Sequence, residues 1–188
     1  MNVLTFDVAL AAKLKKAFAR SGWDESDINR LAESPELAGV RNFLRGHASI
    51  VAAEHVIDCD ADPFVPGGWS VSEHQKAGSF QWDASKVELW LASDQKNCYD
   101  LDGHKIRRQV AKKVPFNANV LDYLLANPHL IPEEWKSVRV FFWGTLYFPP
   151  GRFVCVRCLL WKDGRWGWGR RWYGANFGGK DPALLRAS

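Results

Sequence analysis

Tryptophan and arginine alternate with glycine near the carboxyl end of this chain. Trp166, Trp168, Arg170 and Trp172 recur at every second residue, so in an extended strand their side chains would share one face. Flat aromatic rings stack on unpaired bases, and guanidinium groups bind phosphate through paired hydrogen bonds. The pattern therefore predicts a surface for RNA or single-stranded DNA, although the same rings could pack in the core. The contacts we expect come from Arg165, Trp166, Trp168, Arg170, Arg171 and Trp172, with Lys105, Arg107 and Arg108 neutralising backbone phosphates.

Three aspartates form a second candidate site. Asp58, Asp60 and Asp62 alternate in the sequence, so in an extended chain their carboxylates could hold a divalent cation. With His55 or His74 as general base, such a site would serve a metal-dependent hydrolase. Apart from this metal, we expect no cofactor. The alternative, which we favour, is that these acids cap a loop and pair with basic residues.

Cys155 and Cys158 have the Cys-x-x-Cys spacing of zinc and redox sites. Because the segment around them reads as a strand, residues three positions apart should point to opposite faces. Cys59 and Cys98 do not supply a second pair. We expect buried thiols that bind no metal.

The composition is that of a globular domain. Of the 188 residues, 47% are hydrophobic and 24% are charged, which excludes disordered, collagen-like and coiled-coil chains. The net charge of +4 combines 10 basic and 15 acidic residues in positions 1–100 with 15 basic and 6 acidic residues in positions 101–188. The basic half could contact a polyanion, or the acidic half of its own chain.

Neither the amino-terminal segment nor the longest apolar run has the pattern of an export signal or a membrane span. Asp7 and the lysines that follow it interrupt any apolar stretch near the amino terminus. The longest apolar run, residues 140–148, is well short of the roughly 20 residues that span a bilayer. We therefore expect a cytoplasmic protein with reduced thiols and no membrane partner.

Residues 1–48 should form three short helices. Thr5 and Asp24 are the expected caps of the first two, and Pro35 begins the third. A helix-turn-helix unit is one interpretation, but its recognition helix would offer only Arg41, Asn42 and Arg45 to DNA. A packing or docking unit is favoured, and a protein–protein adaptor that docks through residues 1–48 is therefore a further alternative.

Residues 49–188 should form one domain of helices and antiparallel strands. We expect strands at 53–58 and 86–91, an irregular loop at 60–68, helices at 103–113 and 118–126, the second with Asn117 as its cap, and a helical turn at 132–135. Strands at 138–148, 152–161 and 166–173 should form a meander before a glycine-rich tail, with Asp163-Gly164 in a hairpin turn. The fold class is thus α+β: an antiparallel β-meander with packed helices, preceded by a short three-helix segment.

The resemblance of this chain to known proteins lies in four sequence segments of residues 49–188: HVIDCDADPFVPGGW, QWDASKVELWL, NANVLDYLLANPHLIPEEWK and VFFWGTLYF. They are similar to a group of short bacterial proteins of unknown function. The resemblance implies a bacterial, stand-alone protein and implies no activity, cofactor or catalytic residue. From the residues themselves, we expect a non-enzymatic binding protein.

Overall fold

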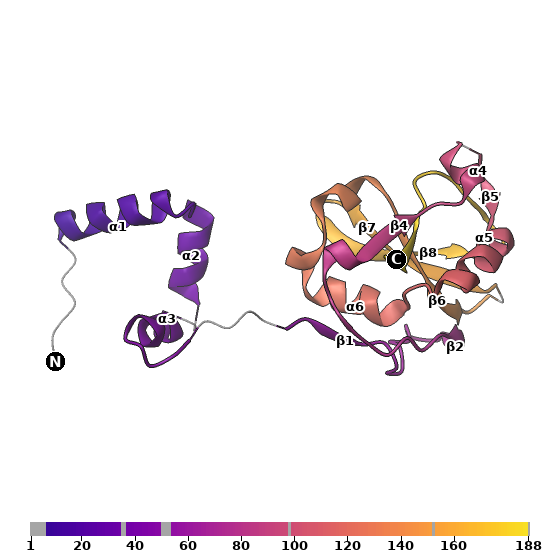
Figure 1. Cartoon of the computed structure of the whole chain (residues 1–188), viewed down its shortest axis with the longest axis horizontal. Coiled ribbons are helices and arrows are strands. Elements are labelled where there is room, and N and C mark those ends of the chain that lie inside the picture. Colours follow the sequence, from indigo (N-terminus) through magenta and orange to yellow (C-terminus); the bar gives the residue numbers. More distant parts are fainter. Residues whose placement is uncertain (1–6, 35–36, 50–53, 98, 152, 188) are drawn as a thin grey trace. The chain divides into compact units, whose positions relative to one another are not determined.

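The structure is a computed structural model that describes residues 7–34, 37–49, 54–97, 99–151 and 153–187. The chain divides into two compact units, residues 1–53 and residues 54–188 (Figure 1). This division lies near the one expected after residue 48. Within the described ranges, no helix combines the length and the apolar character that crossing a membrane requires.

Three helices make up the described part of the amino-terminal unit: α1 (Val8–Arg20), α2 (Glu25–Glu33) and α3 (Leu37–Leu44). The carboxylate of Asp7 caps α1 by accepting a hydrogen bond from the Leu10 amide. The expected cap, Thr5, lies outside the described residues, as does Pro35. Asp24 caps α2 as predicted. None of the residues assigned to these three helices is buried, although Phe18 is half-buried against the Trp23 ring.

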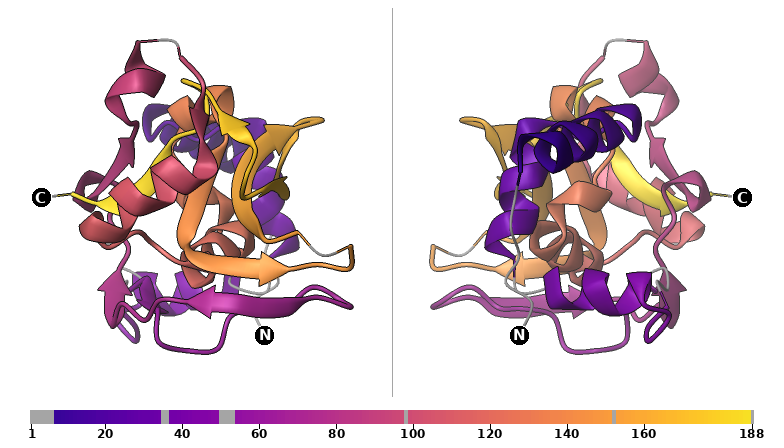
Figure 2. Two further views of the ribbon diagram at one scale, coloured as in Figure 1. Left: turned by 90° about the vertical axis from the view of Figure 1, so that its right-hand side faces the viewer. Right: turned by 90° about the vertical axis from the view of Figure 1, so that its left-hand side faces the viewer.

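A six-stranded sheet forms the core of the second unit. Its strands are β2 (Ser70–His74), β4 (Val87–Trp90), β6 (Val140–Phe148), β7 (Cys155–Lys162), β8 (Arg165–Trp172) and β10 (Ala183–Arg186). Five of them follow the order β4–β10–β6–β7–β8, which makes β8 an edge strand. Strand β2 pairs with the second half of β6, and the two lie side by side in Figure 2. Only the β10–β6 pair is parallel within this described sheet.

Two short antiparallel pairs and several helices complete this unit. The pairs are β1 (Val56–Asp58) with β3 (Ser79–Gln81), and β5 (Leu101–Asp102) with β9 (Asn176–Phe177). The α-helices are α4 (Ser93–Lys96), α5 (Gly103–Val110) and α6 (Ala118–Ala126). Single 3-10 turns cover Ala84–Lys86, Ala111–Lys113, Pro128–Leu130 and Glu133–Ser137.

Helices cover both faces of the sheet. Leu121 of α6 packs in one apolar cluster with Phe142 and Leu159, while Ile106 of α5 packs in another with Phe141. The neighbours Phe141 and Phe142 belong to different clusters because successive side chains of a strand point to opposite faces. We call these two sides of the sheet the α6 face and the α5 face.

A glycine allows α6 to begin close against the sheet. A Cβ atom at Gly144 would lie 2.9 Å from the Cα of Asn117. Because this Cβ atom is absent, the backbones approach closely, and the Gly144 amide donates a hydrogen bond to the Phe116 carbonyl. Glycine within a strand is typical of such close backbone approaches, and here it lets the Asn117 cap reach the sheet.

The predicted α+β class and C-terminal meander are confirmed, but five strands were missed. β2 and β3 follow the irregular loop, β5 immediately precedes α5, and β9 and β10 lie in the segment we read as a glycine-rich tail. In β10, Leu184 packs on the α6 face and Leu185 on the α5 face. The three buried residues of β10, Ala183–Leu185, are all apolar and show no alternation of polar and apolar types, so the periodic signal of a strand is absent.

Candidate nucleic-acid interface

Strand β8 separates its large side chains from its glycines. Its register with β7 pairs Trp166 with Trp161, Trp168 with Leu159 and Arg170 with Arg157, which places these side chains on the α6 face. Gly167 and Gly169 point the other way. A Cβ atom at Gly169 would lie 2.8 Å from a methyl group of Leu160. The absence of a side chain at Gly169 therefore leaves room for the Leu160 side chain beside β8. The predicted one-sided arrangement is therefore present.

The three tryptophans of this face differ in exposure. Trp168 is 40% exposed and Trp172 is 52% exposed. Trp166 is only partly exposed because it packs on the apolar cluster of the α6 face and lies 5.2 Å from the Trp161 ring. Phe153, which is 63% exposed, joins the open group at 5.5 Å from the Trp172 ring. We call Phe153, Trp168, Arg170 and Trp172 the aromatic platform.

Arg170 carries the positive charge of the platform. Its guanidinium group lies 4.8 Å from the centre of the Trp69 ring, and Trp69 in turn meets the Trp168 ring edge-on at 5.8 Å. No carboxylate of the described residues forms an ion pair with Arg170. Arg170, Phe153 and Trp172 also line a shallow hollow of about 210 Å³ beside the Pro149–Gly151 turn. The platform thus combines flat rings with an unneutralised cation.

A buried arginine supports the platform from below. Arg157 lies 4.6 Å from the centre of the Trp168 ring, and its two terminal nitrogens donate to the carboxylate of Asp122 on α6 at 3.0 and 2.7 Å. Burial lowers the pKa of Arg157, but its hydrogen bonds and charge interactions with Asp122 and Tyr147 outweigh burial and raise the pKa above the usual value. Arg157 is therefore a fixed, neutralised support for Trp168.

The other predicted cations do not share this surface. Arg171 points to the α5 face and donates to Asp181 at 2.7 Å. Arg107 of α5 is paired with Glu73 at 2.7 Å. Lys105 and Arg108 are exposed on α5, the helix that covers the α5 face, and Arg165 is exposed at the β7–β8 turn. The structure thus separates the predicted contacts into an aromatic group and basic residues elsewhere.

Two of the three aspartates, Asp58 and Asp60, organise a loop. Asp58 accepts hydrogen bonds from the amides of Asp60 and Ala61, and Asp60 accepts one from the Gly78 amide at 2.8 Å. In the described part of the chain, no three His, Cys, Asp or Glu side chains are grouped so as to hold a metal ion. Asp58, Asp60 and Asp62 therefore provide no ligand cluster for the metal-dependent hydrolase.

Two asparagines at the start of α6 tie this loop to the sheet. Asn117 donates to the carbonyls of Cys59 and Gln75, and Asn119 donates to those of Asp58 and Ala61. The sequence indicated Asn117 as a helix cap, which it is, but gave no signal for these distant contacts. They make the loop a structural element of the fold.

The two candidate histidines also have structural partners. The Nδ1 atom of His74 lies 2.9 Å from the Thr145 hydroxyl, and that of His55 lies 3.0 Å from the Tyr123 hydroxyl. Burial lowers the pKa of His74 below its usual value, so the neutral form is favoured in the fold. These contacts anchor the chain segments around β1 and β2.

The described cysteines behave as core residues. Cys59, Cys155 and Cys158 are free and buried, and burial raises the pKa of each thiol to about 11. Cys155 packs with Ala118 of α6, whereas Cys158 packs in the cluster of the α5 face. The prediction that the Cys-x-x-Cys residues point to opposite faces is therefore confirmed; Cys98 lies outside the described residues.

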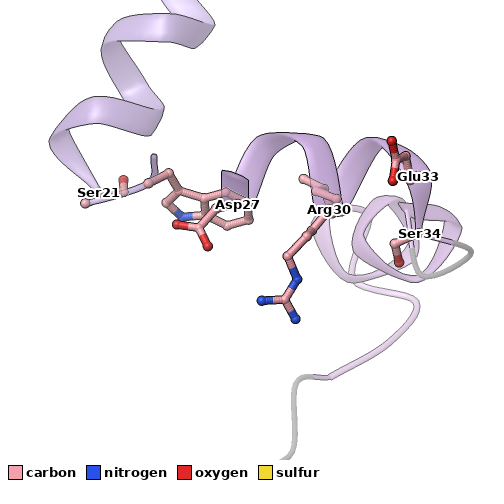
Figure 3. A pocket seen from close by; sticks show the side chains of 8 residues that line it. Ser21, Asp27, Arg30, Glu33 and Ser34 are labelled. Atoms are coloured by element: carbon pink, nitrogen blue, oxygen red, sulfur yellow. The ribbon is translucent and has the colours of Figure 1, made fainter. Parts of the chain in front are cut away.

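A further hollow, of about 740 Å³, lies in the amino-terminal unit. Figure 3 shows Asp27, Arg30 and Glu33 of α2 around it, with Ser21 and Ser34 at its two ends. The acidic and basic side chains of this hollow are exposed to solvent. It has neither the single sign of charge nor the enclosure of a small-molecule site.

Comparison with protein-family models, with curated proteins and with solved structures finds no match for this chain. The resemblance to short bacterial proteins stays a prediction. Any function must therefore be argued from the geometry of this chain.

Proposed function

We propose that this protein binds single-stranded nucleic acid, RNA or DNA, through the aromatic platform and catalyses no reaction. The observation that carries the proposal is that two exposed indole rings, Trp168 and Trp172, flank Arg170 on one face of an edge strand. Stacking on an aromatic side chain contributes about 1–3 kcal/mol per base. Arg170 would bind a phosphate between two stacked bases, because no described carboxylate competes for it.

Basic residues away from the platform would add weaker support. Arg165, Lys105 and Arg108 are exposed and have no ion pair among the described residues. They would raise the local concentration of a polyanion without reading its sequence. A cytoplasmic location belongs to the same proposal, since single-stranded nucleic acid, above all RNA, is found there.

The proposal is tested by fluorescence anisotropy with labelled oligo(dT) and oligo(U). Trp172→Ala and Trp168→Ala should each weaken binding by about 5- to 100-fold, which corresponds to the loss of one stacked base. Tyr99→Ala is the matched control, because Tyr99 is 70% exposed and lies outside the platform. Circular dichroism of each variant checks that it is folded. Equal affinity of all variants, or no binding at low salt, would refute the proposal.

A second candidate function, a protein–protein adaptor, is favoured by one observation on the amino-terminal unit. Leu37, Val40 and Leu44 of α3 are all exposed and recur at the spacing of one helix face. Such a face fits a groove on a protein partner. If the protein is an adaptor, its complex with the protein partner, reconstituted from purified components, should be lost in the Val40→Glu variant and retained in the Asn42→Glu variant. A complex that survives both changes would contradict it.

A further inference from the structure

Basic side chains line the end of the sheet where β6 begins and β7 ends. Two hollows there, of about 310 and 520 Å³, share Arg139 and Lys180 in their walls, and we call the two together the basic groove. The charged residues of this basic groove are Lys136, Arg139, Lys162, Arg171 and Lys180, against Asp100 and Asp181. The groove therefore has an excess of positive charge.

Asp181 orients two of these cations. Its side chain is only 2% exposed, and it lies 2.7 Å from Arg139 Nε and 2.7 Å from Arg171 Nη1. The Gly178 amide also donates to this carboxylate, and Arg171 donates to the Asn176 carbonyl. One buried carboxylate thus accepts a hydrogen bond from Arg171 and forms an ion pair with Arg139, and its single charge can neutralise only one of them.

The lysines of the groove add charge that is weakly compensated. Lys180 is exposed and has no ion pair within the described ranges. Lys162 lies 4.0 Å from Asp163, but both side chains are at least 75% exposed, so water screens that pair. Lys136 is paired with Glu133 and covers the Trp161 ring at 4.1 Å. Arg139 and Lys180 are the two cations that line both hollows, so either can contact a ligand bound in one of them.

We propose that the basic groove is a phosphate-binding site in which Arg139 and Lys180 contact the phosphate and Asp181 positions Arg139. A fixed guanidinium group bonds two phosphate oxygens at once, and an ammonium group adds a point charge. The phosphate could belong to a small phosphorylated compound or to a nucleic-acid backbone. This site is independent of the aromatic platform, because Arg171 and Asp181 lie on the α5 face and the platform lies on the α6 face.

The test is a titration of the full chain with pyrophosphate, followed by 15N NMR. Pyrophosphate should shift the amide signals of residues 178–181 and the Nε signal of Arg139. Lys180→Gln and Arg139→Gln should each weaken this binding by about tenfold, the loss expected for one charged hydrogen bond. Lys112→Gln is the matched control, since Lys112 is exposed and lies outside the groove. No saturable shift at these residues, or equal affinity in all three variants, would overturn the proposal.

Competition with oligo(dT) identifies the source of the phosphate. If the oligonucleotide displaces pyrophosphate and binds Lys180→Gln more weakly, the groove holds a backbone phosphate. If oligonucleotide affinity is unchanged in Lys180→Gln while pyrophosphate binding is weakened, the groove holds a small phosphorylated compound. Loss of oligonucleotide binding only in the Trp172→Ala variant supports the platform, so failure of either proposal leaves the other testable.

Discussion

Arg157 and Arg170 are directly opposite each other on neighbouring strands, yet their surroundings differ completely. Arg157, on β7, is 1% exposed and bound to Asp122 through two hydrogen bonds. Arg170, on the edge strand β8, is exposed and rests on the Trp69 ring. Like charges at directly opposite positions are destabilising, and here Asp122 and Trp69 each offset that repulsion. The pair therefore separates a structural arginine from one available to a ligand.

The same distinction applies to consecutive residues of β8. Arg170 points to the α6 face without a carboxylate partner among the described residues, whereas Arg171 points to the α5 face and is bound to Asp181. A count of basic residues in the sequence treats all of these side chains alike. What differs is whether the tertiary structure brings a carboxylate within hydrogen-bond distance.

The largest expected effect is the loss of the buried arginine. Arg157→Met leaves the Asp122 carboxylate, which is 28% exposed, without its partner, and should lower the free energy of unfolding by about 3 kcal/mol. Arg170→Met should change it by less than about 0.5 kcal/mol, as is usual for surface sites. Urea unfolding of both variants measures the difference. Equal destabilisation would remove the distinction between the two arginines.

The two asparagines of α6 extend the comparison to uncharged groups. Asn117 is fully buried, and Asn117→Ala would leave the Cys59 and Gln75 carbonyls without their donor. We expect a loss of about 2 kcal/mol for this variant, and about 1 kcal/mol or less for Asn119→Ala, whose hydrogen bonds are exposed. Urea midpoints give both values. A larger loss for Asn119→Ala would mean that burial does not decide the effect.

A smaller effect concerns the salt dependence of nucleic-acid binding. Arg170→Gln should reduce the slope of log affinity against log salt by about one phosphate contact, which is about 0.7 for single strands. Lys112→Gln should leave the slope unchanged, because Lys112 lies outside both the platform and the basic groove. Anisotropy titrations between about 50 and 200 mM salt measure the slopes. An unchanged slope for Arg170→Gln would exclude its phosphate contact.

The smallest expected effect is the pH dependence due to His74. Its pKa is lowered in the folded state by burial, so the unfolded chain binds the proton more tightly than the folded one. The contribution of His74 to stability is present above about pH 6.5, the ordinary histidine pKa, and is lost as the pH falls through the folded-state pKa. His74→Asn should reduce the fall in Tm between pH 7.5 and 5.5. An unchanged fall would assign the dependence to other groups.

Local elements of this fold could be predicted because their signals lie close together in the sequence. Asn117 caps α6 as expected, and Asp163 and Gly164 form the β7–β8 turn with φ values of 52° and 75°, the positive values that a tight hairpin needs. Alternation along β8 correctly predicted one face with Trp168, Arg170 and Trp172. It could not predict that Trp166 is partly covered, since that depends on its contact with the core.

By itself, the sequence determined the α+β class, the meander, the caps of α2 and α6 and the one-sided pattern of β8, because each follows from cap or turn chemistry or from the two-residue period of a strand. Only the tertiary structure decided which cations have partners: Asp122 lies 35 residues from Arg157, and Asp181 lies 10 residues from Arg171. It also placed β10 beside β6. Such pairings arise from packing between distant segments, for which a local pattern contains no signal.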